Sequence, residues 1–224
     1  SVSRDIQVQM RRRYGIRSRF IPNGVVMHPP VPLEKLRERL GLVEGRYVLF
    51  LGRFVPEKGC DVLIRAFRGL PHDVRLVMGG DLTENDYLAR LRDLAANDDR
   101  IVFPGGLYGR EKAEALSNAA VFVLPSYLEG MAIGLLEALS YGCPVVASDI
   151  PQNLEVLRSA PDAEGSTFRV GDPADLRDTL GEMLRDVLSG PGWQRRNPAR
   201  VARAYDWRTI AAATENVYRA ARGR

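Results

Sequence analysis

The residues from 47 to 67 decide the fold, and they read Tyr47-Val-Leu-Phe-Leu-Gly-Arg-Phe-Val-Pro-Glu-Lys-Gly-Cys-Asp-Val-Leu-Ile-Arg-Ala-Phe67. The first five residues form a short apolar run that Gly52 closes, which is typical of a buried strand. From Asp61 onward, the apolar side chains of Val62, Ile64 and Phe67 recur near the 3.6-residue period of a helix. This stretch therefore predicts a strand, a loop and a helix in succession.

Four further apolar runs end in turn signals in the same way. They span 74–78, 101–103, 121–124 and 144–147, and glycine, proline or serine follows each of them. Helix-length patterns separate these runs, for example over residues 87–94. Strands that alternate with helices need right-handed crossovers, which give a parallel sheet with helices on both faces. The sequence predicts an α/β fold with a doubly wound, Rossmann-like parallel sheet.

Both ends of the chain depart from this alternation. Residues 1–14 predict a helix with no strand before it, and residues 173–188 and 207–222 predict two helices with no strand between them. Asp206 is a candidate N-cap of the last helix. An α/β domain that begins and ends on such helices is expected to be part of a larger chain.

The composition excludes several classes of protein. The chain has 224 residues, of which 45% are hydrophobic and 27% are charged, with only two cysteines and two histidines. These proportions are ordinary for a globular protein and exclude disordered and disulfide-scaffold classes. No apolar run approaches the roughly 20 residues of a spanning helix, and no secretory signal is visible. We therefore expect a cytoplasmic protein without a metal centre.

The positive charge is concentrated at the N-terminus. The chain carries a formal charge of +4, and residues 1–20 hold six arginines against one aspartate, Asp5. The rest of the chain is close to neutral. Such a segment is typical of a solvated helix, and it could also touch phosphates or an anionic membrane surface.

Cations and glycines follow the predicted strands, where ligands bind in a doubly wound sheet. Gly52, Arg53 and Lys58 come after the first strand, and Lys58 is one of only three lysines in the chain. Cations beside a helix N-terminus suggest a phosphate group. The sequence has no Asp-x-Asp pair, so a diphosphate bridged by a divalent cation is not supported. We expect protein cations and backbone amides to neutralise any bound diphosphate.

Two carboxylates, Glu129 and Glu137, lie eight positions apart in the sequence. Gly130 and Gly134 make a helix through the whole stretch unfavourable, so the helix is expected to begin near Ile133. Glu129 then lies on the loop and Glu137 close to the first helical turn, and both line the crevice. The amides between them would face an anion.

The segment from Glu129 to Ser148 resembles the E-x7-E signature of retaining GT-B glycosyltransferases of family four. Further stretches are similar to that family in the same order: Ile21-Pro-Asn-Gly24, Gly52-Arg-Phe-Val-Pro-Glu-Lys-Gly59, Val121-Phe-Val-Leu-Pro-Ser126 and Asn153-Leu-Glu-Val156. The resemblance covers about residues 18–222 and matches the C-terminal, donor-binding half of such enzymes. It implies the C-terminal half of a two-domain GT-B fold.

The resemblance also implies roles for particular residues. Arg53 and Lys58 match the cations that hold the donor diphosphate and stabilise it as the leaving group. Glu129 matches the carboxylate on the donor sugar and is counted with these two cations as catalytic. Glu137 matches the carboxylate that accepts both ribose hydroxyls, and Leu107 the backbone contact to the base. The remaining donor contacts that it implies are Gly52, Gly130, Met131, Ala132, Ile133 and Gly134, of which Met131-Ala132 departs from the family's common Phe-Gly.

The implied protein is a hexosyltransferase that moves a sugar from a UDP- or GDP-sugar to an acceptor hydroxyl, with no cofactor and no metal. Residues 1–17 would be a remnant of an absent N-terminal acceptor domain, 18–206 the donor-binding domain, and 207–224 a helix that packs back towards the absent half. The fragment alone is expected to be inactive, and no nucleic acid is expected as a partner. The full enzyme would be cytoplasmic, either free or in peripheral contact with the inner face of the membrane.

Three other interpretations stay open at this point. A nucleotide-sugar epimerase of the same fold would keep the diphosphate cations but would not need the Glu129-x7-Glu137 spacing. A non-catalytic nucleotide-sugar-binding module would bind without turnover. A phosphate- or RNA-binding protein would use the six N-terminal arginines, with an affinity that falls steeply with salt.

Overall fold

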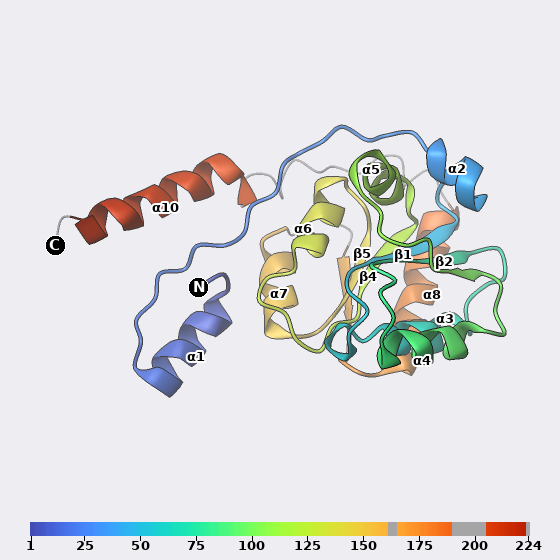
Figure 1. The fold of residues 1–224 in the computed structure, drawn as a ribbon, viewed down its shortest axis with the longest axis horizontal. Coiled ribbons are helices and arrows are strands. Elements are labelled where there is room, and N and C mark those ends of the chain that lie inside the picture. Colours follow the sequence, from blue (N-terminus) through green and yellow to red (C-terminus); the bar gives the residue numbers. More distant parts are fainter. Residues whose placement is uncertain (161–164, 190–204, 223–224) are drawn as a thin grey trace.

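The computed structural model describes residues 1–160, 165–189 and 205–222, and it contains one six-stranded sheet (Figure 1). All strand pairs are parallel, in the order β3-β2-β1-β4-β5-β6. The strands are β1 Tyr47–Leu51, β2 Arg75–Gly79, β3 Ile101–Val102, β4 Val121–Leu124, β5 Val145–Ser148 and β6 Gly165–Phe168. The predicted doubly wound α/β sheet is confirmed, and its five predicted strands form within one residue at each end.

Helices cover both faces of the sheet. One face packs against α3 Cys60–Phe67, α4 Asp86–Ala95 and α8 Pro173–Ser189, and the other against α2 Lys35–Leu40, α5 Gly109–Asn118, α6 Ile133–Ser140 and α7 Pro151–Arg158. Successive residues of β1 alternate between the two cores, since Val48 and Phe50 enter the first and Tyr47 and Leu49 the second. Strands buried on both sides explain why the sequence shows continuous apolar runs.

The two terminal helices lie beside this body, on the side of α6 and α7 (Figure 1). Helix α1, Arg4–Tyr14, contacts α7, where the Arg4 amide donates to Glu155 Oε2 at 2.9 Å. Helix α10, Trp207–Arg222, begins where Asp206 pairs with Val25, and the Asp206 carboxylate accepts the amide of Arg208 as expected of an N-cap. Both predicted helices are confirmed. The proposed boundaries at residues 17/18 and 206/207 stay predictions, and residues 161–164, 190–204 and 223–224 lie outside the described residues.

In the part of the chain that the structure describes, no helix is both long enough and apolar enough to cross a membrane.

The loops that follow β1 and β4 touch through their backbones. The short 3-10 helix Pro56–Lys58 lies in the first loop, and the Tyr127 amide of the second loop donates to Glu57 O at 2.8 Å. Gly59 has φ +61, and a Cβ atom placed there would lie 2.2 Å from the carbonyl oxygen of Pro125. Only glycine permits this approach, which brings the two loops together above the sheet.

A buried carboxylate fixes the connection that precedes β1. Glu114 of α5 is fully buried and accepts the amides of Glu34 and Leu36, each at 3.1 Å, at the start of α2. Arg110 Nε donates to its second oxygen at 3.1 Å. Burial raises the pKa of Glu114, but these hydrogen bonds outweigh it, and the pKa lies below its ordinary value. The ionised carboxylate therefore stabilises the fold.

Glu114→Gln should lower the free energy of unfolding at pH 7 by about 1–3 kcal/mol, because one acceptor is replaced by an amide that cannot satisfy all three donors. A depressed pKa contributes stability above the unfolded-state value, near 4.3 for a glutamate, and this stability is lost as the pH falls through the folded-state value. The difference between wild type and variant in urea denaturation should therefore shrink below about pH 4. Glu111→Gln, on the same helix with an exposed partner, is the control, and an equal loss there would contradict the assignment.

Gly59→Ala should separate the two loops, because its Cβ would overlap a backbone carbonyl. Gly15, at φ +67 with open space where a Cβ would lie, provides the matched control. Gly15→Ala should cost only the left-handed conformation, roughly 1–2 kcal/mol in denaturant unfolding. Gly59→Ala should cost at least about 1 kcal/mol more, as overpacking does. Equal losses in the two variants would show that the close approach does not exist.

Candidate functional site

A cavity of about 330 Å³ opens at the carboxyl ends of β1 and β2, beside the N-terminus of α6. The lining includes six of the residues predicted from the sequence: Gly52, Arg53, Leu107, Ile133, Gly134 and Glu137. Strand order reverses between β1 and β4, which is where ligands bind in doubly wound sheets. The structure therefore brings these six residues together at the expected edge.

The N-terminus of α6 presents free amides to this cavity. The helix begins at Ile133, as predicted, and its N-cap Ala132 offers no side-chain hydrogen bond. Within the described residues, the amides of Ile133 and Gly134 have no hydrogen-bond partner, and both residues line the cavity. Unpaired amides and the positive end of the helix dipole attract an anion.

Arg53 adds a positive charge at the same edge. Its side chain is exposed and lines the cavity, and it has no carboxylate partner among the described residues. An unpaired guanidinium can form two parallel bonds to an oxyanion. With the α6 amides, Arg53 makes this part of the cavity suited to a phosphate.

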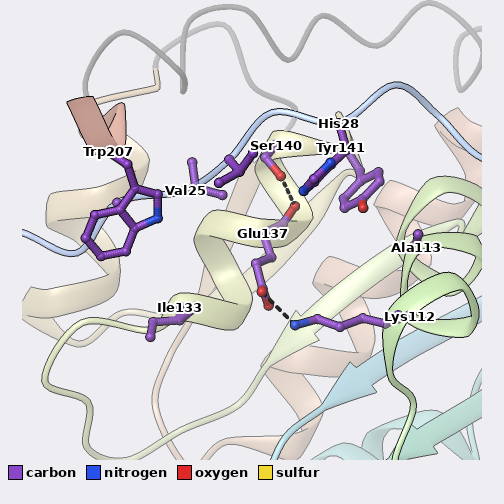
Figure 2. Close-up of a pocket in the computed structure, with 12 residues that line it drawn as sticks. Val25, His28, Lys112, Ala113, Ile133, Glu137, Ser140, Tyr141 and Trp207 are labelled. Atoms are coloured by element: carbon purple, nitrogen blue, oxygen red, sulfur yellow. Dashed lines mark hydrogen bonds and ion pairs between the residues drawn. The ribbon is translucent and has the colours of Figure 1, made fainter. Parts of the chain in front are cut away.

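Glu137 meets a lysine that was not among the residues predicted from the sequence. Lys112 Nζ of α5 lies 2.6 Å from Glu137 Oε1, and both side chains are partly exposed in the cavity. Figure 2 shows the two side chains reaching toward one another from α6 and α5. The scarcity of lysine, which singled out Lys58, was a signal that applied equally to Lys112.

Glu129 and Lys58 form a second ion pair, outside the lining of that cavity. Lys58 Nζ lies 2.5 Å from Glu129 Oε1, and their side chains are only 19% and 8% exposed. Ser126 Oγ donates to the same oxygen at 2.7 Å. The touching loops after β1 and β4 carry the two partners, so the backbone contact at Gly59 holds the pair in place.

The remaining residues predicted from the sequence differ in their exposure to solvent. Gly130 is exposed, whereas Met131 and Ala132 are buried, and Met131 Sδ accepts the amide of Asn23 at 3.3 Å. Leu107 is also buried. Met131 and Ala132 therefore point into the body of the protein, and any contact of these two residues or of Leu107 with a ligand would be made by the backbone.

A second cavity, of about 400 Å³, borders the Lys112–Glu137 pair (Figure 2). It shares Lys112, Ile133 and Glu137 with the first cavity and lies between α5, α6, the 24–28 segment and Trp207. His28 stacks on Tyr141 in its wall, with ring centroids 5.9 Å apart. The ion pair thus lies on the boundary between the two cavities.

In the described ranges, no three His, Cys, Asp or Glu side chains gather as metal ligands. The charged groups that face the two cavities are arginine, lysine and carboxylates, which suit a hydroxylated anion. The arrangement can bind phosphate oxygens at α6 and Arg53, and hydroxyl groups at Glu137 in the cavity and at Glu129 beside it.

Comparison with known proteins identifies the family. Residues 33–199 match the model of the glycosyl transferases group 1. The chain is 34% identical to a D-inositol 3-phosphate glycosyltransferase of Xylanimonas cellulosilytica, over 92% of this chain and 53% of that protein. It is also 34% identical to a phosphatidyl-myo-inositol mannosyltransferase of Mycobacterium leprae, over 88% of this chain and 52% of that protein. The chain spans about half the length of these curated relatives.

Solved structures of similar fold are also longer. A sucrose-phosphate synthase of Thermosynechococcus elongatus has a TM-score of 0.84 and 25% identity, over 99% of this chain and 57% of that chain. The Anabaena protein HepE in complex with UDP-glucose has a TM-score of 0.87 and 21% identity, over 98% of this chain and 63% of that chain. The family match, together with relatives of 34% identity, shows that the chain belongs to the group 1 glycosyl transferases.

Proposed function

We propose that this chain is the donor-binding domain of a retaining GT-B glycosyltransferase of family four. The full enzyme transfers a hexosyl group from a UDP- or GDP-sugar to an acceptor hydroxyl. The observation that carries this proposal is the meeting of free α6 amides, Arg53 and Glu137 in one cavity at the reversal of strand order. That set matches the chemistry of a nucleoside diphosphate, which presents phosphate oxygens and ribose hydroxyls.

The donor diphosphate lies between the α6 N-terminus and the loop after β1. The amides of Ile133 and Gly134 donate to its oxygens, and Arg53 closes over it from the exposed side. As the bond to the sugar breaks, negative charge accumulates on the departing diphosphate. Arg53 and Lys58 stabilise that charge, and such electrostatic stabilisation commonly contributes more to catalysis than any other single effect.

The nucleoside extends from the diphosphate towards α5. Glu137 accepts the two ribose hydroxyls, and the backbone at Leu107 contacts the base. Lys112 stays beside Glu137 and holds its carboxylate in an ion pair. The backbone around Gly52 lines the same cavity and contacts the donor, while a Cβ at this position would lie 3.0 Å from the Phe50 ring.

The transferred sugar lies at the Lys58–Glu129 pair. Glu129 accepts hydrogen bonds from the sugar hydroxyls, and the backbone from Gly130 to Gly134 borders the ring. We propose that no divalent cation and no other cofactor takes part, because the site supplies its own cations. The acceptor binds mainly to a second domain, residues 1–17 are the remnant of that domain and residues 207–224 pack back towards it. The chain alone binds donor and transfers nothing.

The rival functions have less support. A nucleotide-sugar epimerase is not favoured, because the family match and the two curated relatives are glycosyltransferases. A non-catalytic nucleotide-sugar-binding module would use the same donor contacts, so the family match and the curated relatives, which are named as transferases, are what favour an enzyme. HepE in complex with UDP-glucose supports a nucleotide-sugar donor.

We also propose that the full enzyme works in the cytoplasm at the inner face of the membrane, through peripheral contact. Five arginines support this: Arg11, Arg12, Arg13, Arg17 and Arg19 have no carboxylate partner among the described residues. Exposed Val8, Tyr14 and Ile16 lie among them, on or next to α1. Guanidinium groups interspersed with apolar side chains suit a lipid surface, which offers both anionic headgroups and a hydrocarbon boundary.

Glu137→Ala should weaken the binding of UDP or GDP at least tenfold, because it removes two charge-assisted bonds to ribose, each worth about 1.5–3 kcal/mol. Glu129→Ala should leave that affinity within about twofold, since a bare nucleotide does not reach the sugar site, and should abolish the extra affinity for the nucleotide-sugar. Calorimetric titration in EDTA measures both, and an undiminished affinity in EDTA supports the absence of a metal.

Glu111→Gln is the control for these two substitutions, because Glu111 lies on α5 beside Arg39 and lines neither cavity. Its affinity for all ligands should equal that of the wild type. If Glu129→Ala weakens bare nucleotide as much as Glu137→Ala does, the two carboxylates have been assigned to the wrong parts of the donor.

Replacing Arg11, Arg12 and Arg13 by Gln should weaken binding to phosphatidylserine-containing vesicles roughly a hundredfold, at about 1 kcal/mol for each arginine. Vesicle sedimentation measures this binding, and raising the salt concentration should weaken it for the wild type.

The control is the exposed triple variant Arg65→Gln, Arg90→Gln and Arg185→Gln, which removes the same charge from α3, α4 and α8. It should bind vesicles as the wild type does. If the wild type bound RNA and not the vesicles, the partner of α1 would be a nucleic acid and the membrane proposal would be wrong.

A further inference from the structure

One oxygen of Glu129 is fully engaged and the other is free. Oε1 accepts from Lys58 Nζ at 2.5 Å and from Ser126 Oγ at 2.7 Å. Oε2 has no hydrogen-bond partner in the part of the chain that the structure describes. The carboxylate plane is therefore held from one side, and its second oxygen is available to a ligand.

A chain of buried hydrogen bonds stands behind Ser126. Asn153 Nδ2, on α7, donates to both the carbonyl oxygen and Oγ of Ser148 at 3.1 Å. Ser148 Oγ, at the end of β5, donates to the Ser126 carbonyl oxygen at 2.5 Å. All three residues are completely buried. The chain thus ties the loop that carries Glu129 to two regular elements of the fold.

The direction of each donation follows from the number of protons available. Ser148 Oγ accepts from Asn153, so its single hydroxyl proton is left for the Ser126 carbonyl. The single hydroxyl proton of Ser126 goes to Glu129 in turn. If the Asn153 amide were turned over, its oxygen would face the Ser148 carbonyl, acceptor against acceptor. Each hydrogen bond is therefore donated in the direction from α7 towards the Glu129 carboxylate.

Within the described ranges, the chain of hydrogen bonds leaves one buried acceptor of Asn153 unsatisfied. Asn153 Oδ1 is buried without a hydrogen-bond partner among the described residues. An unsatisfied buried acceptor costs free energy, and an apolar side chain of similar shape at position 153 would avoid that cost. The orientation of Ser148 towards Ser126 gives a reason to keep an amide donor at this position.

We propose that Ser126 is a positioning residue for Glu129, and that Ser148 and Asn153 hold it in place. Ser126 and Lys58 bind one carboxylate oxygen, which presents the other to the hydroxyls of the transferred sugar. Catalytic groups need such support from residues that do not touch substrate, because a displacement of the group by about 1 Å lowers the reaction rate. This inference rests on the proposed function, which puts Glu129 at the sugar.

The test measures how much the sugar adds to binding. Calorimetry gives the affinities of UDP-glucose and UDP, and of GDP-mannose and GDP, for the wild type and for Ser126→Ala. With the donor pair that the wild type prefers, Ser126→Ala should lower the ratio of nucleotide-sugar to nucleotide affinity at least threefold. The affinity for bare nucleotide should stay within about twofold, because the diphosphate and ribose contacts are untouched.

A double-mutant cycle separates positioning from general damage. In a Glu129→Ala background, Ser126→Ala should have no further effect on that ratio, because there is no carboxylate left to position. Ser140→Ala is the matched control, since Ser140 is an equally buried serine whose hydroxyl bonds only to a helix carbonyl among the described residues. It should leave the ratio unchanged.

A second variant tests the hydrogen bond behind Ser126. Ser148→Ala removes the hydroxyl that donates to the Ser126 carbonyl oxygen, and it adds neither charge nor volume to the buried site. It should lower the ratio in the same direction as Ser126→Ala, and this comparison serves if Ser126→Ala does not fold.

The outcomes distinguish the two levels of the proposal. An unchanged ratio in Ser126→Ala or Ser148→Ala, with the ratio lost in Glu129→Ala, overturns the positioning role alone. A ratio that Ser126→Ala lowers equally in the Glu129→Ala background also overturns it. A wild type that binds no nucleotide overturns the proposed function and this inference together.

Discussion

The site depends on the parallel pairing of β1 with β4, where the strand order reverses. The chain leaves β1 toward one edge of the sheet and leaves β4 toward the other, so the loops after these strands diverge over a crevice. In this protein the loops still touch, at Gly59 and Pro125, before they part. That contact puts Lys58 against Glu129, and the helix that follows β4 brings the amides of Ile133 and Gly134 to the same place.

The carboxylates of the site are paired with lysines before any ligand arrives. Glu129 faces Lys58, and Glu137 faces Lys112. Partly buried carboxylates without partners would be costly, and the lysines offset that cost. Arg53 lines the cavity without a carboxylate partner among the described residues, and it supplies the positive charge that attracts an anion. The ion pairs thus stabilise the empty protein, and Arg53 prepares it for an anionic ligand.

Much of the fold could be predicted from the sequence, because strands buried on both faces are continuous apolar runs that glycine or proline closes. The strand β6, Gly165–Phe168, was missed, since it lies at the edge of the sheet with three of its four residues only partly buried or exposed. The start of α6 was predicted correctly from Gly130 and Gly134. The sequence did not identify Lys112 as the partner of Glu137, because that contact depends on how α5 packs against α6. It did not identify Ser126 as the partner of Glu129, because that contact depends on the turn of the loop after β4.

The central claim is that a nucleotide-sugar binds at the carboxyl edge of the sheet, and amide chemical shifts in nuclear magnetic resonance test it most directly. The ¹⁵N-labelled chain is titrated with UDP-glucose and with GDP-mannose in EDTA. The amides of Gly52, Arg53, Leu107, Ile133 and Gly134 should shift together and saturate with one affinity for one of the two ligands. Shifts confined to the second cavity, at Val25, His28 and Tyr141, or the absence of any saturable shift, would contradict the account.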